Sequence, residues 1–184
     1  MVLGYAIAFV LAFVLTLLLL IWAAPRRYQV KVSRRLPAPT DRVWAYVSEP
    51  ERYPYWFPYV ASCKQDGGPP RGVGQKRHLQ LDRNGVLGQR DDEVTLWTEG
   101  RRIEMDQKNE QLRGRAVGWR NAHAEYHLEP DGDGTRFTGV LWFYGRGLLG
   151  GVFSLLSFRK RHEKDLRLAL TYLEKRLREE TYPA

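Results

Sequence analysis

The sequence contains a single cysteine, Cys63, and that scarcity excludes several kinds of site. One thiol cannot form an internal disulfide and cannot build a cysteine-based metal centre. Because Cys63 follows a cluster of aromatic residues, a small buried hydrophobe is the simplest role for it. Internal repeats and low-complexity tracts are also absent, so one domain with an appendage is the expected organisation of the 184 residues.

Charged residues are missing from residues 2–24, where fourteen of the side chains are Val, Leu, Ile or Phe. At about 1.5 Å of rise per residue, a helix of this length crosses the roughly 30 Å hydrocarbon layer of a bilayer. A cleaved signal peptide is the alternative, but no basic residue precedes the apolar run, which is also longer than the hydrophobic region of such peptides. The sequence therefore predicts a transmembrane anchor over residues 1–25 and a folded domain over residues 26–184.

Five basic residues follow the apolar run with no acidic residue between them: Arg26, Arg27, Lys31, Arg34 and Arg35. By the positive-inside rule, this flank predicts a single-pass membrane protein whose folded domain lies in the cytoplasm. The same charges could also hold the domain against anionic headgroups, or they could serve topology alone. Both interpretations stay open.

The whole chain is basic, with 29 Lys and Arg against 21 Asp and Glu. Such an excess is compatible with anionic lipid or with nucleic acid as a partner. The basic residues are spread over the anchor flank, the turns and the last helix, and no known nucleic-acid-reading motif is present. We therefore expect no nucleic-acid partner.

Residues 36–60 carry the strongest local signals. Thr40 or Asp41 can cap a first helix, because a short side-chain oxygen satisfies an exposed backbone N–H. Pro50 suits the first turn of a second short helix, where its missing N–H would have had no partner. An aromatic cluster then closes the stretch.

This stretch resembles the opening of the START-like, polyketide cyclase/dehydrase superfamily (SRPBCC), whose members share the helix-grip fold. The residues that carry the resemblance are Ala38-Pro39, Val43-Trp44, the run from Ser48 to Tyr53, and Trp56. It extends over roughly residues 28–180 and implies an α+β fold of the Bet v 1/START type. Such a fold has a curved antiparallel sheet, two short helices after the first strand, and a long C-terminal helix. The resemblance also implies a cavity for apolar or amphipathic ligands, without implying one chemistry.

Strands joined by short turns are predicted for the middle of the chain. They are expected at residues 28–35, 60–65, 73–81, 87–98, 102–108, 114–128 and 135–144. Asn84-Gly85 is a hairpin signal, and residues 130–134 form the clearest turn in the chain. Consecutive strands with short connections predict an antiparallel sheet.

A long helix is predicted over residues 148–179. Its buried face is expected to carry apolar residues at helical spacing: Leu166, Ala169, Leu170, Leu173 and Leu177. The more apolar residues 148–158 could line a ligand site or enter a membrane interface, although core packing is the preferred interpretation. The glycines from Gly145 to Gly150 match GxGxxG, but no second parallel strand follows, so a dinucleotide site is rejected.

Two strands carry polar clusters with residue types suited to chemical sites. His123, Glu125 and His127 share one face of a strand, and the alternating apolar residues predict that this face meets water. We therefore expect no metal site and no cofactor. Asp91, Asp92 and Glu93 alternate between faces, so at least one can point inward beside an arginine: Arg113, Arg115 or Arg120.

The favoured function is binding or transfer of a hydrophobic or amphipathic small molecule, such as a lipid, an isoprenoid or an aromatic compound from the adjacent bilayer. Strand alternation and the architecture that the resemblance implies predict the ligand-binding residues: Trp56, Leu79, Trp97, Met105, Tyr126, Leu141 and Phe153. A register error of one residue would turn the strand positions outward.

Two alternatives belong to other classes. A cyclase- or dehydratase-like enzyme would need an inward polar group with a shifted pKa, drawn from Asp91, Glu93, Arg120 or a histidine. A non-catalytic interaction domain would have its cavity filled by its own aromatic side chains.

Overall fold

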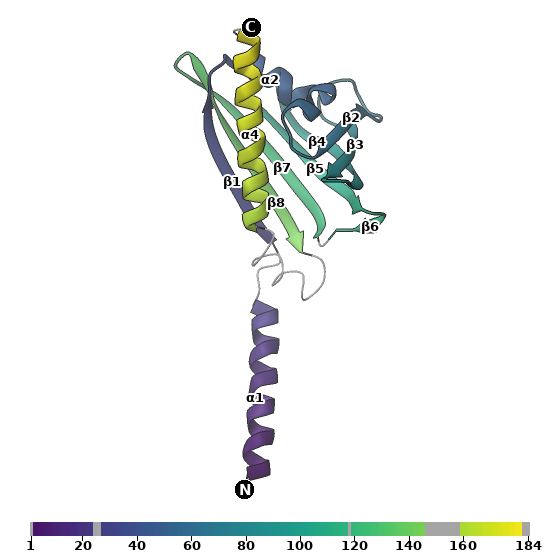
Figure 1. The fold of residues 1–184 in the computed structure, drawn as a ribbon, viewed down its shortest axis with the longest axis vertical. Coiled ribbons are helices and arrows are strands. Elements are labelled where there is room, and N and C mark those ends of the chain that lie inside the picture. The colour runs from purple at the N-terminus through teal and green to yellow at the C-terminus, as the bar shows by residue number, and fades with distance from the viewer. Residues whose placement is uncertain (1, 24–26, 118, 146–158, 182–184) are drawn as a thin grey trace.

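The chain forms a curved sheet crossed by one long helix, with a separate N-terminal helix (Figure 1). The computed structural model describes residues 2–23, 27–117, 119–145 and 159–181. Within these ranges, the side chains at 2, 3, 6, 8, 20, 21, 23, 119, 120, 145 and 181 are left out of the description. The predicted ligand residue Phe153 and the rest of residues 146–158 lie outside the described residues.

The strands form one sheet in which each ladder is antiparallel, as the sequence predicts. Its order is β1-β8-β7-β5-β4-β3-β2, with β6 paired to β5. The strands are β1 (Arg27–Leu36), β2 (Val60–Gln65), β3 (Lys76–Arg83), β4 (Val86–Thr98), β5 (Arg102–Leu112), β6 (Arg115–Ala116), β7 (Trp119–Asp131) and β8 (Gly134–Gly145). Burial alternates along β1, so one face of the sheet is apolar and the other meets solvent.

The β3–β4 turn has the geometry that its sequence predicts. Asn84 and Gly85 both have positive φ, 56° and 81°, which is the backbone of a type I′ hairpin. Some bounds differ from the expectation: β3 begins at Lys76, and the arm predicted over residues 114–128 divides into β6 and β7. The sequence pattern predicted the strands but not the short hairpin that β6 forms with the end of β5.

Two short helices follow β1 as predicted, α2 (Thr40–Ser48) and the 3₁₀ helix η1 (Pro50–Tyr55). The expected side-chain cap on α2 is wrong. Pro39 occupies the N-cap position and no side chain caps it, while the Thr40 hydroxyl lies 3.3 Å from that of Thr135 on β8. The contact with Thr135 engages the Thr40 oxygen instead, and Pro39 itself fixes where the helix begins.

The C-terminal helix α4 (Arg159–Thr181) lies across the inner face of the sheet beside β1 (Figure 1). The predicted apolar face is confirmed, because its five residues are fully buried: Leu166, Ala169, Leu170, Leu173 and Leu177. The helix approaches β8 closely at Gly139, where an added Cβ would meet the Leu166 and Phe137 side chains at 3.2 Å. All residues of the described core cluster lie between Tyr28 and Leu177. The domain therefore has a core of its own.

The N-terminal helix α1 (Val2–Ala23) contributes nothing to that core. Its described large apolar side chains are exposed, for example Phe9, Leu11 and Trp22. A search of the described residues finds no helix with both the length and the apolarity to cross a membrane. The transmembrane anchor over residues 1–25 stays a prediction.

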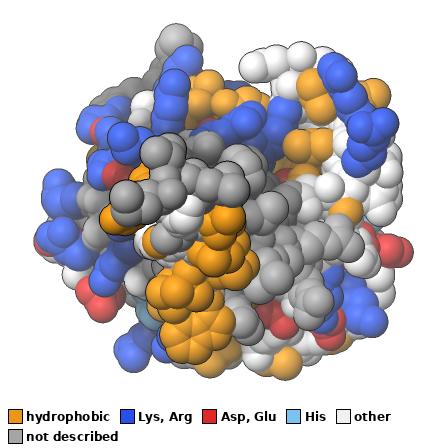
Figure 2. All heavy atoms as spheres, turned by 90° about the horizontal axis from the view of Figure 1, so that it is seen from below, with side chains coloured by type: hydrophobic (Ala, Val, Ile, Leu, Met, Phe, Trp, Pro, Cys, Tyr) orange, Lys and Arg blue, Asp and Glu red, His pale blue; other side chains and the backbone are white. Residues whose placement is uncertain are grey.

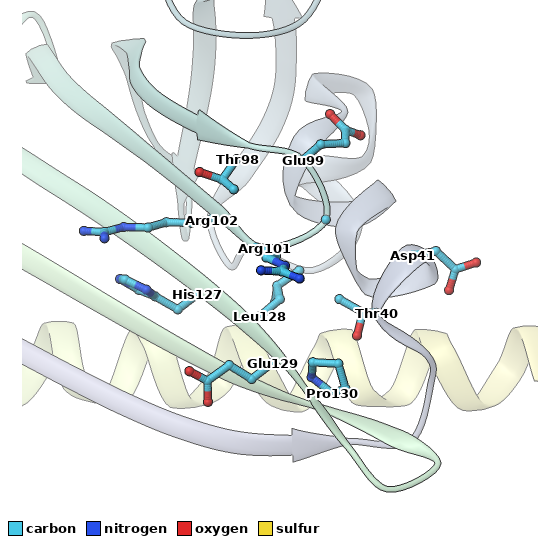
Figure 3. A pocket seen from close by; sticks show the side chains of 11 residues that line it. Thr40, Asp41, Thr98, Glu99, Arg101, Arg102, His127, Leu128, Glu129 and Pro130 are labelled. Atoms are coloured by element: carbon cyan, nitrogen blue, oxygen red, sulfur yellow. The ribbon is translucent and has the colours of Figure 1, made fainter.

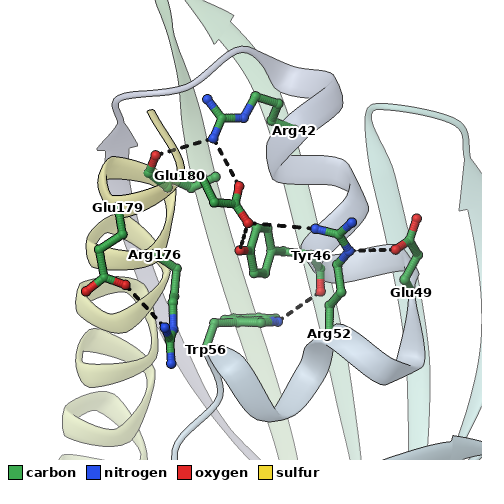
Figure 4. Close-up of polar contacts among 9 residues, drawn as sticks. Arg42, Tyr46, Glu49, Arg52, Trp56, Arg176, Glu179 and Glu180 are labelled. Atoms are coloured by element: carbon green, nitrogen blue, oxygen red, sulfur yellow. Dashed lines mark hydrogen bonds and ion pairs between the residues drawn. The ribbon is translucent and has the colours of Figure 1, made fainter. Parts of the chain in front are cut away.

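Polar contacts join the end of α4 to α2 and η1 (Figure 4). The Tyr46 hydroxyl donates a hydrogen bond to Glu180, and Arg42 lies 3.0 Å from the same carboxylate. Arg52 pairs with Glu49 at 2.6 Å and reaches Glu180 at 4.0 Å. The hydrogen bond from Tyr46 lowers the pKa of Glu180. This cluster, which we call the Glu180 clamp, closes the grip at its C-terminal end.

Replacing Glu180→Gln should lower the free energy of unfolding by up to about 1 kcal/mol, because the carboxylate is partly exposed to solvent. A lowered pKa means that this contribution is present above the ordinary value of 4.5 and is lost as the pH falls through the lowered pKa. Denaturant unfolding at neutral and at acidic pH measures the difference. The control is Glu179→Gln, which loses only pairs within α4. An equal loss in both variants would contradict the clamp.

Candidate functional site

Aromatic side chains fill the space between the sheet and the helices α2 and η1, at the end of the domain where α4 ends; we call this space the upper interior. Tyr53, Trp56, Tyr126 and Phe137 are all fully buried. The Trp56 ring makes edge contacts with the other three, and its Nε1 donates a hydrogen bond to the Tyr46 carbonyl at 2.9 Å. Trp56 therefore ties η1 and α2 to the inner face of the sheet.

Two buried tyrosines meet in this cluster, with the hydroxyls of Tyr53 and Tyr126 at 2.7 Å. Burial raises the pKa of Tyr53 well above its usual value and that of Tyr126 to about 12. Both phenols are consequently neutral at physiological pH, and they act as hydrogen-bonding groups instead of bases.

An ion pair between Arg90 and Asp92 is buried on the inner face of β4. The guanidinium donates two hydrogen bonds to the carboxylate, at 2.7 and 3.0 Å. Nearby on β3, Arg77 is 1% exposed and donates to Gln75 and to the carbonyls of Val47 and Ser48. Both arginines have the multiple acceptors that a buried guanidinium requires.

A second polar group lies where the β3–β4 turn approaches the first turns of α4. Arg83 stands between two carboxyls, 3.9 Å from Glu110 and 3.5 Å from Asp165, and its guanidinium lies 5.2 Å from the centre of the Tyr59 ring. Burial raises the pKa of Asp165. The long distances make these ion pairs instead of hydrogen bonds.

One cross-strand row runs beside this group on the inner face of the sheet. Register places Tyr28 opposite Phe143, Phe143 opposite Ala122, and Ala122 opposite Gln107. At one end of the row, the Tyr28 hydroxyl is 2.9 Å from Nδ1 of His162 on α4. Ala122, between Phe143 and Gln107, has the smallest side chain of the row.

The structure turns most of the predicted ligand residues inward. Trp56, Leu79, Met105, Tyr126 and Leu141 are all buried. Trp97 is partly buried and packs against the core, because a bulge in β4 between Val94 and Leu96 brings it opposite the buried Ile103. Its Nε1 donates to Glu99 at 2.6 Å. Binding by these residues stays untested. They line neither of the two hollows found at the surface.

One hollow of about 680 Å³ lies outside the grip, between the start of α2, the β4–β5 turn and the end of β7 (Figure 3). Its lining is mixed, with Arg101, Arg102 and His127 beside Asp41 and Glu129. The second hollow, of about 230 Å³, is lined mainly by charged residues that include Lys76, Asp91 and Lys108. The charged lining of the second hollow differs from the apolar lining expected of a lipid site.

The acidic candidates on β4 divide between the two faces. Asp91 points outward and lies 2.8 Å from His78, and Glu93 pairs with Lys108 at 3.0 Å. Asp92 is the inward residue, but its partner is Arg90 and not Arg113 or Arg115; the Arg120 side chain lies outside the described residues. The sequence could have indicated that Asp92 points inward, because Arg90, Asp92 and the buried Val94 occupy alternate positions of β4 and so share one face of the strand.

The histidines of β7 lie on the outer face, as predicted. His123 is 2.8 Å from Asp106 and 3.3 Å from Glu104, and His127 is 3.3 Å from Glu125. Among the described residues, no group of His, Cys, Asp and Glu has the arrangement of a metal site.

The most informative interior residues were missed from the sequence. Arg83, Gln107 and Asp165 are polar positions at the margins of apolar patterns, and periodicity alone would assign Arg83 and Asp165 to solvent. Asp165 directly precedes the buried Leu166, and Gln107 continues the inward parity of Ile103 and Met105. Parity could have identified Gln107; the Arg83 to Asp165 contact joins residues far apart in the chain and had no local signal.

The fold and its interior define a helix-grip protein. The family model described as polyketide cyclase/dehydrase and lipid transport matches residues 27–178, and the chain belongs to this family. No match was found among curated proteins.

Solved structures share the fold at low sequence identity. TTHA0849 from Thermus thermophilus has a TM-score of 0.67 and 17% identity, over 84% of this chain and 100% of that chain. A START superfamily protein from Mycobacterium smegmatis has a TM-score of 0.67 and 18% identity, over 82% and 97%. Ginseng major latex-like protein 151 from Panax ginseng has a TM-score of 0.67 and 11% identity, over 83% of this chain and 98% of that chain.

Replacing Asp92→Asn should lower the free energy of unfolding by about 3 to 5 kcal/mol, because the Arg90 charge would remain buried without its counter-ion. The matched control is Asp91→Asn, one residue away on the solvent face, for which a loss of about 1 kcal/mol or less is expected. Denaturant unfolding of both variants measures this. Similar losses would show that the Arg90–Asp92 pair is not buried as described.

Proposed function

We propose that the domain binds an amphipathic small molecule between the sheet and α4, with the polar group of the ligand near Gln107, Arg83 and Asp165. One observation carries this proposal. Gln107 Nε2, Arg83 Nε and Asp165 Oδ2 are buried and have no hydrogen-bond partner among the described residues. Leaving such an atom unsatisfied costs about 1 to 3 kcal/mol, so a ligand that offers a donor and an acceptor would be stabilised there.

The neighbouring side chains suit an apolar ligand body. Met105, Ala122, Ala124 and Phe143 are buried beside Gln107 on the inner face of the sheet. The two alanines contribute little side-chain volume to this part of β7. This combination of an apolar surface and a few converging polar groups is typical of small-molecule sites. A lipid, an isoprenoid or an aromatic compound with a polar end has the required chemistry.

We also propose that α1 tethers the domain to a membrane, with the domain in the cytoplasm. The support comes from the complete sequence of residues 2–24, which has no charge and includes positions outside the described residues. Orientation rests on the basic flank. The number of free cations in the flank is lower than the sequence suggests, because Arg34 pairs with Glu174 and Arg35 with Asp133 of the same domain.

Native purification of the full chain, extraction with organic solvent and mass spectrometry test the binding proposal. We expect a stoichiometric amphipathic molecule that is enriched over the host background. Gln107→Leu keeps the side-chain size but removes the buried donor, and it should reduce ligand occupancy about tenfold. The control Gln89→Leu alters an exposed position of β4 and should retain the ligand.

An empty but folded protein would contradict this proposal and favour the non-catalytic interaction domain. Equal loss of ligand in Gln107→Leu and Gln89→Leu would instead place the site away from Gln107. The thermal unfolding of each variant is compared with that of the parent chain, so that loss of ligand is separated from loss of fold.

A second candidate is a cyclase- or dehydratase-like enzyme at the same site. Asp165 favours it, because burial raises the pKa of a carboxyl that lies 3.5 Å from Arg83. A carboxyl with a raised pKa holds its proton at a higher pH than an ordinary aspartate does, which suits it to donate a proton to a bound ligand. The buried tyrosines would then supply hydrogen bonds, not the base.

Asp165→Asn separates the two functions. If the domain only binds its ligand, the parent chain and the variant should yield the same compound. If Asp165 transfers protons during a dehydration, the variant should retain a compound heavier by one water molecule than that recovered from the parent chain. Mass spectrometry of the extracts distinguishes these results.

A further inference from the structure

One end of the domain carries six exposed basic residues: Arg27, Arg113, Arg115, Arg159, Lys160 and Arg161. We call this end the basic pole. At it, β1 begins opposite the end of β8, and β5 ends beside the β3–β4 turn. Contacts from Tyr28 and Arg83 to residues 162 and 165 bring the first turns of α4 to the same end. The cations come from three distant parts of the chain.

The cations of the basic pole form no ion pair with a described residue, in contrast to most arginines at the other end. There, Arg34 pairs with Glu174 at 2.7 Å, Arg42 with Glu180 at 3.0 Å, and Arg176 with Glu179 at 3.2 Å. Unpaired cations of one sign create a net local field that attracts an anionic partner. The formal net charge of the chain is +8, so a large part of that excess gathers at one end.

The acidic side chains near the basic pole are engaged with other cations, and only Asp165 also offsets part of the Arg161 charge. Glu163 is engaged with Arg167 on α4 at 2.7 Å, and Glu110 and Asp165 are buried beside Arg83. Figure 2 views the molecule from this side and shows Lys and Arg side chains on several parts of the rim, with fewer acidic side chains between them.

Exposed apolar and aromatic side chains accompany the cations. Leu87, directly after the β3–β4 turn, is 68% exposed, and Tyr144 at the end of β8 is 41% exposed. The Arg27 guanidinium lies 5.5 Å from the centre of the Trp142 ring. Basic residues mixed with tyrosine and leucine are typical of surfaces that meet the interface of a membrane.

We propose that the basic pole docks on anionic lipid headgroups. Only residues 24–26 separate α1 from Arg27, a length of about 10 Å when fully extended. A tether in α1 would therefore hold this pole, and no other part of the domain, at the bilayer surface. The charges and the exposed Leu87 stand independently of that tether, so the docking does not depend on the ligand or on the insertion of α1.

Nucleic acid is the competing anionic partner. It is less favoured because the pole presents Leu87 and Tyr144 to the partner, and because the chain continues from this pole into an uncharged apolar segment. Binding to nucleic acid is an outcome of the test below.

Residues 27–184 can be tested without α1, since the described core lies wholly between residues 28 and 177. The probes are vesicles of pure phosphatidylcholine and vesicles in which phosphatidylglycerol replaces about a third of it. We expect the domain to float with the anionic vesicles and not with the neutral ones. Added salt should weaken the binding steeply, because it screens exposed charges.

Replacing basic residues with glutamine tests which surface of the domain binds the vesicles. Together, Arg159→Gln, Lys160→Gln and Arg161→Gln should weaken binding to the anionic vesicles by about a hundredfold, since each basic residue near the surface contributes roughly a fivefold factor. The control combines Lys64→Gln, Lys76→Gln and Arg101→Gln, which remove the same charge from exposed residues away from the pole. It should bind within about threefold of the parent domain.

Three results would overturn the proposal: equal binding to both kinds of vesicle, equal weakening by the two triple variants, or tighter binding to single- or double-stranded DNA than to the anionic vesicles. Thermal unfolding checks that both variants are folded. Ligand recovery from the full chain is measured separately, so failure of docking leaves the binding function unaffected.

Discussion

A sheet with one apolar face must be covered, and a single helix is too narrow to do so. Neighbouring strands lie about 4.8 Å apart, so the sheet is roughly 30 Å wide along its path, whereas a helix with its side chains is about 10 Å across. The curvature of the sheet and the pair α2 and η1 close part of the difference. Trp56 and Tyr53 fill the inner space beside them. What remains is the part of the inner face near the beginning of α4, where Gln107, Arg83 and Asp165 are found; we call it the lower interior.

This constraint explains why the interior is divided. At the upper end, the Glu180 clamp holds α4 against α2, and the aromatic rings leave little room for water or ligand. At the lower end, α4 meets the β3–β4 turn through Arg83, at distances too long for hydrogen bonds. The lower end is also held by the hydrogen bond between Tyr28 and His162 at 2.9 Å, so the contacts that a ligand group can replace there are the long ones of Arg83. Binding would therefore disturb the fold least where the unsatisfied polar atoms lie.

Sequence patterns predicted the architecture well because burial follows simple periods. Period-two alternation placed Leu79, Met105 and Leu141 inward, and helical spacing placed Leu166 to Leu177 on the buried face. The inward direction of Arg90 and Asp92 could not be inferred from that of Trp97, because a bulge changes the register of β4 without a residue type that marks it. The Arg83 contact with Asp165 was out of reach for another reason. It joins the β3–β4 turn to α4, and only the folded chain brings them together.

The lower interior and the basic pole occupy the same end of the domain, and this coincidence connects the two proposals. Arg83 reaches inward to Asp165, while Arg159 and Lys160 at the beginning of α4 face solvent. If this end rests on headgroups, an amphipathic molecule passes between the bilayer and the interior with a short exposure of its apolar body to water. At about 25 cal/mol for each Å² of apolar surface, avoiding that exposure matters for any lipid-sized ligand. The polar group would remain at the charged end throughout, near Gln107 inside and near the cations outside. One arrangement of charge would thus serve both the docking of the domain and the orientation of its ligand.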